Sequence, residues 1–199
     1  MTNHPTPVSD QFLVLHTLAI GGLIDDDEIC ERSGLASSVA NLELRDLEQL
    51  GLARRRDGRM AGWMLNEDGR ARHVEFLATA RGDVDLVVVA ARYDEWLPMN
   101  QSFKDVCTTW QTERDHPATC AALAPVVERT VAICTAMGAS VPWMTRYEAR
   151  LAAAAQRFVD GDDTALTRPM SASVHDVWME LHQDLLLTLG RKRSPDDGH

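Results

Sequence analysis

Apolar residues recur at helical spacing in three segments between residues 12 and 50. The first segment, residues 12–20, ends at a pair of glycines. The second, residues 27–34, can be capped by Asp25, Asp26 or Asp27, and it ends at Gly34. The third begins at Ser37 or Ser38. Its side chains available to a hydrophobic core are Val39, Leu42, Leu44, Leu47 and Leu50. The pattern predicts three short helices with a turn between the second and the third.

A basic β-hairpin is predicted after the third helix. Gly51 suits the left-handed conformation that often follows a helix, and Asp57-Gly58 favours a tight hairpin turn. Four arginines stand around that turn: Arg54, Arg55, Arg56 and Arg59. A helix followed by a basic hairpin is the order of a winged helix-turn-helix, in which the helix enters the major groove of DNA and the hairpin reaches the phosphates.

Residues 12–80 resemble the MarR-like winged-helix repressors. The likeness is strongest in GWMLNEDGRARHVEFLA, residues 62–78, which is similar to the second wing strand and the following helix of that family. The resemblance implies a winged helix-turn-helix domain over residues 1–82 and a double-stranded DNA operator as partner. The residues expected in the groove are Ser37, Ser38, Asn41 and Arg45, and those expected at the phosphates are Arg54, Arg55, Arg56 and Arg59.

The net charge of this segment argues against a uniformly basic surface. Residues 1–82 contain 9 Lys/Arg and 13 Asp/Glu, a net charge of −4, whereas DNA-binding domains usually have a basic footprint. The third helix carries Glu43, Asp46 and Glu48, but its N-terminal end has no acidic residue. A homodimer would align two arginine clusters and create a locally basic surface. The alternatives are that the arginines are only solvated, or that the winged helix binds a protein.

The overall composition predicts a folded, acidic protein of the cytoplasm. Hydrophobic residues make up 45% of the chain and the formal net charge is −10, which disfavours nonspecific coating of membranes or nucleic acid. The N-terminal residues contain no apolar signal segment, and no apolar run approaches the roughly 20 residues needed to span a bilayer. The cysteines at 30, 107, 120 and 134 form no CxxC pair and match no zinc signature. We expect buried thiols, no metal and no cofactor.

The sequence pattern of the second half predicts an α-helical bundle over residues 83–190. Together with the small hairpin of the first half, this gives a fold class that is mainly α (α+β). An apolar run at residues 86–91 is either a strand or a linker helix, and Pro98 interrupts the pattern, with Asn100 or Ser102 as the next cap. Further helices are predicted over 118–137 and 143–160. A last helix, residues 174–189, is capped by Ser171 or Ser173 and stopped by Gly190. Residues 191–199 are a polar tail.

Polar and aromatic residues in this half favour a binding site. Four of the five tryptophans lie here, and a cavity with tryptophan walls and cationic edges would suit an anionic or aromatic small molecule. The candidate ligand-binding residues are Asn100, Trp110, Gln111, Arg146, Arg150, His175, Trp178 and His182. The alternative is structural: the tryptophans form a core, and the two arginines pair with Glu148, Asp162 or Asp163. The runs LPMN, TWQ and SVHDVWMELHQDLL are similar to a C-terminal domain of uncharacterised MarR-like proteins, which assigns no residue a role.

Three functions fit these features. The first is a ligand-responsive transcriptional regulator that acts as a homodimer, without membrane attachment. The second is an enzyme in which His175 and His182 act as acid and base and Arg146 or Arg150 holds an anionic substrate, with the winged helix as scaffold or dimerisation element. HDVWMELH lacks the spacing of HExxH, and no nucleotide-binding motif is present. The third is an adaptor that binds a protein through its acidic surface.

Overall fold

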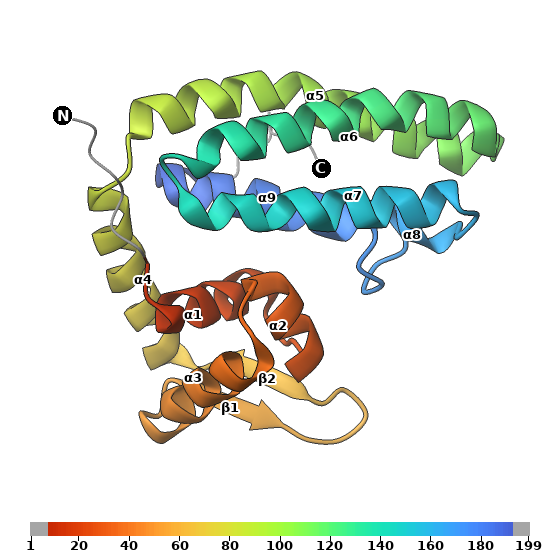
Figure 1. The fold of residues 1–199 in the computed structure, drawn as a ribbon. Helices are drawn as coiled ribbons and strands as arrows, with labels where there is room; N and C mark the ends of the chain where they lie inside the picture. The colour runs from red at the N-terminus through yellow and green to blue at the C-terminus, as the bar shows by residue number, and fades with distance from the viewer. Residues whose placement is uncertain (1–7, 193–199) are drawn as a thin grey trace. The chain divides into compact units, whose positions relative to one another are not determined.

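The computed structural model describes residues 8–192, which form two compact units divided between Val84 and Asp85 (Figure 1). Both units are mainly helical, and the described residues contain one sheet, of two antiparallel strands. The tail predicted at 191–199 lies outside the described residues from position 193 onward. The elements of the first unit are α1 (Asp10–Gly21), α2 (Asp26–Ser33), α3 (Ser37–Gln49), β1 (Ala53–Arg56), β2 (Gly62–Leu65) and α4 (Glu67–Gly82).

Local capping signals set the boundaries of these helices. Asp25 is the cap of α2, since its side chain accepts a hydrogen bond from the Glu28 amide at 2.8 Å. Gly34 follows α2 in the left-handed conformation with φ of 75°. Helix α3 begins at Ser37, but Ala36 occupies its cap position, and no described side chain bonds to the amides of its first turn.

Fewer side chains of α3 are buried in the core of the first unit than the leucine pattern predicted. Leu44 and Leu47 are buried, together with Ala40. Leu42 is 56% exposed and Leu50 is 64% exposed, so their assignment to the core was wrong. Leu42 lies two residues from Leu44, about 200° around a helix of roughly 3.6 residues per turn, and Leu50 follows the last helical residue.

The hairpin is tied to the connection between α1 and α2. Strands β1 and β2 pair from Ala53 opposite Leu65 to Arg56 opposite Gly62, so residues 57–61 form a longer loop than the tight turn predicted. Ile24 and Trp63 exchange backbone hydrogen bonds of 3.1 and 2.7 Å. A Cβ on residue 62 would come within 2.7 Å of the Ile24 carbonyl oxygen, which explains the glycine at this position.

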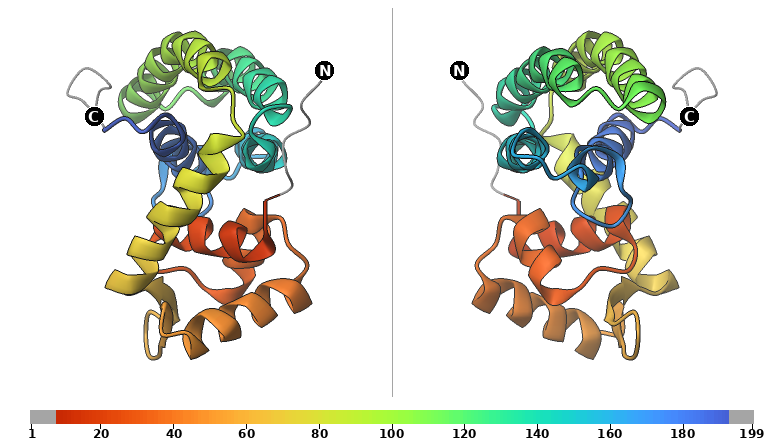
Figure 2. Two further views of the ribbon diagram at one scale, coloured as in Figure 1. Left: turned by 90° about the vertical axis from the view of Figure 1, so that its left-hand side faces the viewer. Right: turned by 90° about the vertical axis from the view of Figure 1, so that its right-hand side faces the viewer.

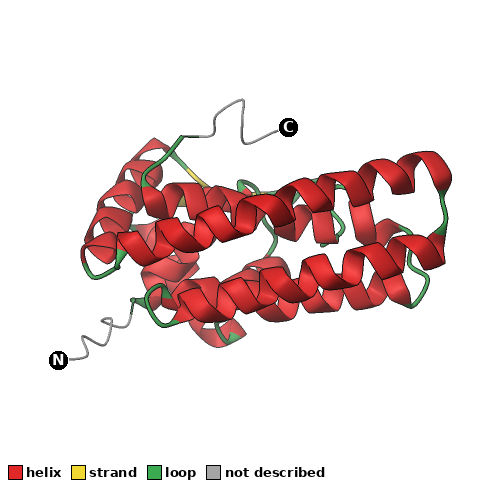
Figure 3. Ribbon diagram, turned by 90° about the horizontal axis from the view of Figure 1, so that it is seen from above, coloured by secondary structure: helices red, strands yellow, loops and turns green. Residues whose placement is uncertain are grey.

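The second unit is an up-and-down bundle of four long helices (Figure 3). Its helices pack in the cyclic order α5, α6, α7 and α9. The connections from α5 to α6 and from α6 to α7 are short, so they place these sequence neighbours side by side and antiparallel, whereas a longer segment, residues 160–173, joins α7 to α9. Its elements are α5 (Leu86–Glu113), α6 (His116–Gly138), the 3-10 helix η1 (Pro142–Thr145), α7 (Arg146–Val159), the short α8 (Thr164–Thr167) and α9 (Val174–Leu189).

Helix α5 continues through Pro98, contrary to the break predicted there. A proline inside a helix removes one hydrogen bond and clashes with the preceding turn. Large aromatic side chains on both sides, Trp96 and Phe103, are buried and hold the helix in place. Asn100 is therefore not a cap; it lies inside the helix and is buried, while Asp85 caps α5 by accepting from two amides.

The two ends of α9 lie where the local capping signals predict them. Ser173 caps α9 in a capping box with Asp176, and Gly190 ends the helix in the left-handed conformation. Between α6 and α7 the predicted helical start at Trp143 is a 3-10 turn, and the α-helix begins at Arg146.

One described helix, α6, is long and apolar enough to cross a membrane by length and composition alone. It packs against α5 and α7 within the bundle. Core helices of soluble proteins also pass such a test, so the helix is consistent with a soluble protein.

Candidate functional site

The N-terminal end of α3 presents a polar, acid-free surface. Ser37 and Ser38 are exposed, Asn41 is half-buried and Arg45 is exposed one turn further on. The first amides of α3 have no capping side chain among the described residues, although the Val39 and Ala40 amides donate to the Ala36 carbonyl. The N-terminus of a helix carries the positive end of its dipole. Such an end suits contact with an anionic group.

The acidic residues of α3 lie away from this end. Burial, followed by the charges of Asp46 and Asp10, raises the pKa of Glu43. Helix α3 packs against α1, where Asp10 lies. Glu43 therefore lies within electrostatic reach of Asp46 and Asp10. Ser37, Ser38 and Asn41 precede all the acidic residues of α3, whereas Arg45 lies within the acidic stretch from Glu43 to Glu48.

The four hairpin arginines divide into two groups. Arg54 and Arg56 alternate with Arg55 along β1, so they point to the opposite face of the strand. Arg54, Arg56 and Arg59 are exposed and form no ion pair with any described residue. Helix α3 and the hairpin lie side by side in the first unit (Figure 2). The three arginines and the α3 end therefore belong to one compact unit.

Arg55 instead binds within the protein. Its guanidinium lies 3.1 Å from a carboxylate oxygen of Asp26 and 5.9 Å from the ring centroid of Trp63. Asp26 also accepts a hydrogen bond of 2.9 Å from the Trp63 indole. The prediction grouped Arg55 with the phosphate-binding arginines; the structure gives it a partner on α2, which sequence spacing could not reveal across 29 residues.

A buried histidine pair in the first unit was not predicted. His16 and His73 meet through ring nitrogens 2.8 Å apart, joining α1 to α4. Phe12 stacks on His16 with ring centroids 5.1 Å apart. The pair is a packing and hydrogen-bonding contact in the core, and its only sequence signal was a histidine among apolar residues.

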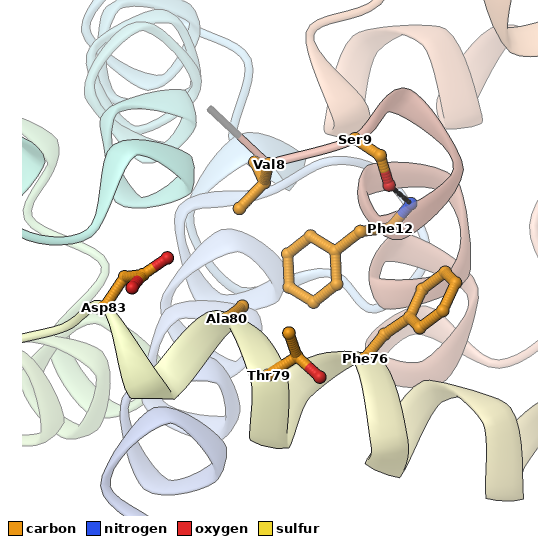
Figure 4. Close-up of a pocket in the computed structure, with 7 residues that line it drawn as sticks. All are labelled: Val8, Ser9, Phe12, Phe76, Thr79, Ala80 and Asp83. Atoms are coloured by element: carbon orange, nitrogen blue, oxygen red, sulfur yellow. Dashed lines mark hydrogen bonds between the residues drawn. The ribbon is translucent and has the colours of Figure 1, made fainter. Parts of the chain in front are cut away.

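A hollow of about 220 Å³ lies next to this pair, between the start of α1 and the end of α4 (Figure 4). Phe12 and Phe76 form its aromatic walls, and Asp83 is the one charged residue among the described residues that line it. The Ser9 hydroxyl already accepts a hydrogen bond from the Phe12 amide at 3.1 Å. The hollow thus offers apolar surface with little polar chemistry.

A second cavity, of about 350 Å³, is a groove between α5 and α9. We refer to it as the α5–α9 groove. Its lining side chains recur every three or four residues on each helix, as expected for two helix faces turned toward each other. They are Asn100, Phe103, Lys104, Cys107, Thr108 and Gln111 from α5, His175, Trp178, Met179 and His182 from α9, and Thr167 from α8.

Packed aromatic rings make the floor of the α5–α9 groove rigid. Phe103 stacks on Trp178 with centroids 4.4 Å apart and an interplanar angle of 21°. The Trp178 indole donates a hydrogen bond of 2.9 Å to the buried amide oxygen of Asn100. His182 lies under Trp96, with ring centroids 4.8 Å apart. These contacts fix the ring orientations before any ligand arrives.

Five of the eight predicted ligand-binding residues lie around the α5–α9 groove, and three do not. Those at the groove are Asn100, Gln111, His175, Trp178 and His182. Trp110 is buried in the core, where it packs edge-on against Phe158 with centroids 5.0 Å apart. Arg146 and Arg150 form ion pairs of 2.8 Å with Asp184 and Glu180. The partners considered from the sequence were Glu148, Asp162 and Asp163, because pairing across helices was not visible.

Asp184 is the centre of a buried polar network that joins α7 to α9. It is fully buried and accepts hydrogen bonds from Arg146 at 2.8 Å, Tyr147 at 2.9 Å and Trp143 at 3.2 Å. Burial would lower the pKa of Arg146, but Tyr147 and Asp184 raise it above its usual value. The arginine therefore remains a buried cation with its charge balanced by Asp184. The network is structural.

The four catalytic candidates do not share one site. His175 and His182 face the α5–α9 groove. The partners of Arg146 and Arg150 lie on α9 at positions 184 and 180, which is the opposite side of the helix at roughly 3.6 residues per turn. The proposed pairing of a histidine acid or base with an arginine that holds the substrate is therefore wrong.

The described residues contain no group of three or more His, Cys, Asp or Glu side chains that could hold a metal ion. The four cysteines are free thiols, with Cys134 buried and the others half-buried. Burial raises the pKa of Cys107, in the groove, to about 12, so this thiol is neutral at physiological pH.

Comparison of the chain with models of protein families, with curated proteins and with solved structures found no match.

Proposed function

We propose that the chain is a ligand-responsive, DNA-binding transcriptional regulator of the MarR-like winged helix-turn-helix type, acting as a homodimer in the cytoplasm. One observation carries the proposal: the acid-free end of α3 lies in the same compact unit as Arg54, Arg56 and Arg59, which form no ion pair with any described residue. A major-groove helix next to a phosphate-binding hairpin requires this combination.

The order of elements supports the winged-helix interpretation. Three helices precede the hairpin. An isolated antiparallel bridge between Ile24 and Trp63 pairs the segment before α2 with strand β2. The Arg55–Asp26 ion pair fixes the base of the hairpin to α2. These contacts would hold the hairpin at a defined position relative to α3, which phosphate binding by its tip requires.

The acidic charge of the chain is compatible with this function. In the proposed homodimer, Arg54, Arg56 and Arg59 of each copy would contact phosphates. The side chains that would contact the base edges are Ser37, Ser38, Asn41 and Arg45. Phosphate contacts supply affinity through release of counterions, whereas net repulsion elsewhere suppresses nonspecific binding. We therefore expect the protein to bind DNA tightly only at its specific sequence.

Sequence selection from random duplexes, followed by fluorescence anisotropy on the selected duplex, tests the proposal. We expect Arg54→Ala/Arg56→Ala to weaken binding at least about ten-fold and to reduce the slope of log K against log salt by about two for each bound protomer. The matched control, Arg168→Ala/Lys192→Ala, removes two exposed positive charges from the second unit and should bind like the wild type. Absence of an enriched sequence, or equal losses in both variants, contradicts DNA recognition by the hairpin.

A further inference from the structure

Leu42 is a large apolar side chain that α3 presents away from the core. Its exposed fraction is 56%, whereas Ala40, Leu44 and Leu47 of the same helix are buried. At about 100° per residue, Leu42 lies roughly 160° around the helix from the middle of that buried face. Burial within the first unit therefore does not account for a leucine at this position.

The side chains that share this face with Leu42 are polar. The residues within two turns that lie on it, at about 100° per residue, are Ser38, Arg45, Asp46 and Gln49, and all four are exposed. The side chains of Ser38, Arg45 and Gln49 form no hydrogen bond or ion pair with any described residue, so they are available to a ligand together with Leu42.

A leucine in this setting can recognise one feature of a base pair. Serine, arginine and glutamine side chains can hydrogen-bond to base edges or to phosphates, but a leucine side chain can do neither. Among the four standard bases, the major groove offers one methyl group, the C5-methyl of thymine, which apolar side chains contact. Ser38 lies one turn before Leu42 and Arg45 one turn after it. A methyl contact by Leu42 would thus fall between two hydrogen-bonding positions in the first turns of a helix that enters the groove.

Asp46 favours the base edges over the phosphates as the surface that this face contacts. It is exposed, one turn beyond Leu42. Phosphates repel a carboxylate, whereas the amino group of cytosine can donate a hydrogen bond to one. The exposed face of α3 therefore suits the base edges of a major groove, while the hairpin arginines suit the phosphates.

We infer that Leu42 is a specificity-determining residue of the proposed DNA interface and packs against the C5-methyl group of a thymine in the major groove. The inference rests on the proposed function and deepens it, because it gives the operator a required chemical feature: a thymine at one fixed position in each half-site. The leucine pattern of the sequence assigned Leu42 to the core, and its exposure in the structure makes it available for this contact.

Replacing each thymine of the selected duplex by deoxyuridine, one at a time, tests the inference. Deoxyuridine lacks the C5-methyl group and keeps every hydrogen-bonding group of thymine. At one thymine of each half-site, we expect the wild-type protein to bind the deoxyuridine duplex about three- to five-fold more weakly, the effect of burying one methyl group. Fluorescence anisotropy measures each Kd. Affinities within about two-fold of each other at every thymine overturn the inference, while tight binding of the selected duplex would leave the proposed function intact.

Variants assign the methyl contact to a residue. We expect Leu42→Ala to bind the thymine and deoxyuridine duplexes with Kd values within about two-fold of each other, because the methyl group has lost its partner. Val74→Ala is the matched control: Val74 is 64% exposed on α4, outside α3 and the hairpin, and this variant should keep the wild-type preference for thymine. Arg54→Ala/Arg56→Ala should bind both duplexes more weakly and also keep that preference, since phosphate contacts carry no base information.

The outcomes separate this inference from the proposed function. A preference for thymine that persists in Leu42→Ala overturns the inference and leaves DNA binding standing. A Leu42→Ala protein that binds DNA like the wild type but sediments as a smaller species would place Leu42 in a contact between copies of the chain, which also overturns it. Absence of any enriched duplex overturns the proposed function and this inference together. If Leu42→Ala fails to fold, NMR on the wild-type complex decides: a nuclear Overhauser effect between a leucine methyl and a thymine methyl, lost with the deoxyuridine duplex, supports the contact, and its absence contradicts it.

Discussion

Arg55 on β1 and Asp26 on the first turn of α2 are joined by an ion pair of 3.1 Å, which links the hairpin to a helix 29 residues away in sequence. The same carboxylate accepts a 2.9 Å hydrogen bond from the Trp63 indole on β2. Asp26 therefore holds both strands of the hairpin. Arg55 acts as a positioning residue for the hairpin, while its neighbours Arg54 and Arg56 remain available to a ligand.

The Asp26 contacts predict a stability difference between adjacent aspartates. Asp26→Ala should lower the free energy of unfolding by about 1–2 kcal/mol, because the Trp63 indole loses a charged acceptor and Arg55 loses its partner. Asp27→Ala removes the same charge from the same helix end, but its side chain is exposed, and its effect should stay below about 0.5 kcal/mol. Urea denaturation of both variants measures the difference. Equal stabilities would show that the Asp26 contacts contribute nothing.

At Gly69 in α4, we expect an alanine substitution to destabilise the protein, the opposite of what helix propensity predicts. Replacing glycine by alanine usually stabilises a helix by up to about 1 kcal/mol, but a Cβ on Gly69 would overlap the backbone carbonyl oxygen of Leu52. We expect Gly69→Ala to destabilise the protein by about 1–3 kcal/mol. Gly82→Ala, at the end of the same helix, meets no atom within 4 Å and should leave the melting temperature unchanged or slightly raised. A stable Gly69→Ala protein would mean that α4 can move away from Leu52.

The half-buried Cys107 and the buried Cys134 are predicted to react slowly with alkylating agents. Burial raises the pKa of Cys107 and of Cys134 to about 12, with the charges of Glu148 and Asp184 adding to the effect at Cys134. The neutral form therefore persists until the pH approaches 12, and the reactive thiolate is scarce at pH 8. We expect mass spectrometry after iodoacetamide treatment at pH 8 to find both sites largely unmodified in the folded protein and fully modified in urea. Rapid modification of Cys107 in the native protein would show an open, more polar groove.

The capping signals at four helix ends were interpreted correctly from the sequence, with Asp25 one of three aspartates considered and Ser173 one of two serines. Asp25 and Ser173 cap helices by bonding to amides three residues ahead, and Gly34 and Gly190 end helices in the left-handed conformation. Each depends only on neighbouring atoms, so local chemistry decides it. The mainly helical fold with a small antiparallel hairpin follows from such signals.

Features that depend on distant partners were not predictable in this way. Pro98 is a local break signal that the buried aromatics around it override. Leucine spacing alone could not tell that Leu42 faces away from the core. Arg146 and Arg150 looked like a ligand-binding pair, but their carboxylate partners come from another helix. For the candidate site, spacing identified histidines and tryptophans, whereas Lys104 required the packing of α5 against α9.

The buried network around Asp184 yields the largest predicted change in stability. Asp184→Asn keeps one acceptor oxygen, which can serve either Trp143 or Tyr147 because these donate to different oxygens of Asp184. It also leaves the Arg146 side chain, which is only 7% exposed, without the charge of Asp184. Removing one partner of a buried pair costs about 3–5 kcal/mol, and denaturant titration should find a loss in this range. Adding Arg146→Met to Asp184→Asn removes the unbalanced charge and should restore most of that loss. The exposed Asp94→Asn serves as the control, with a change below about 0.5 kcal/mol. A double variant no more stable than Asp184→Asn would show that hydrogen bonding to the carboxylate, and not charge balance, makes Asp184 important.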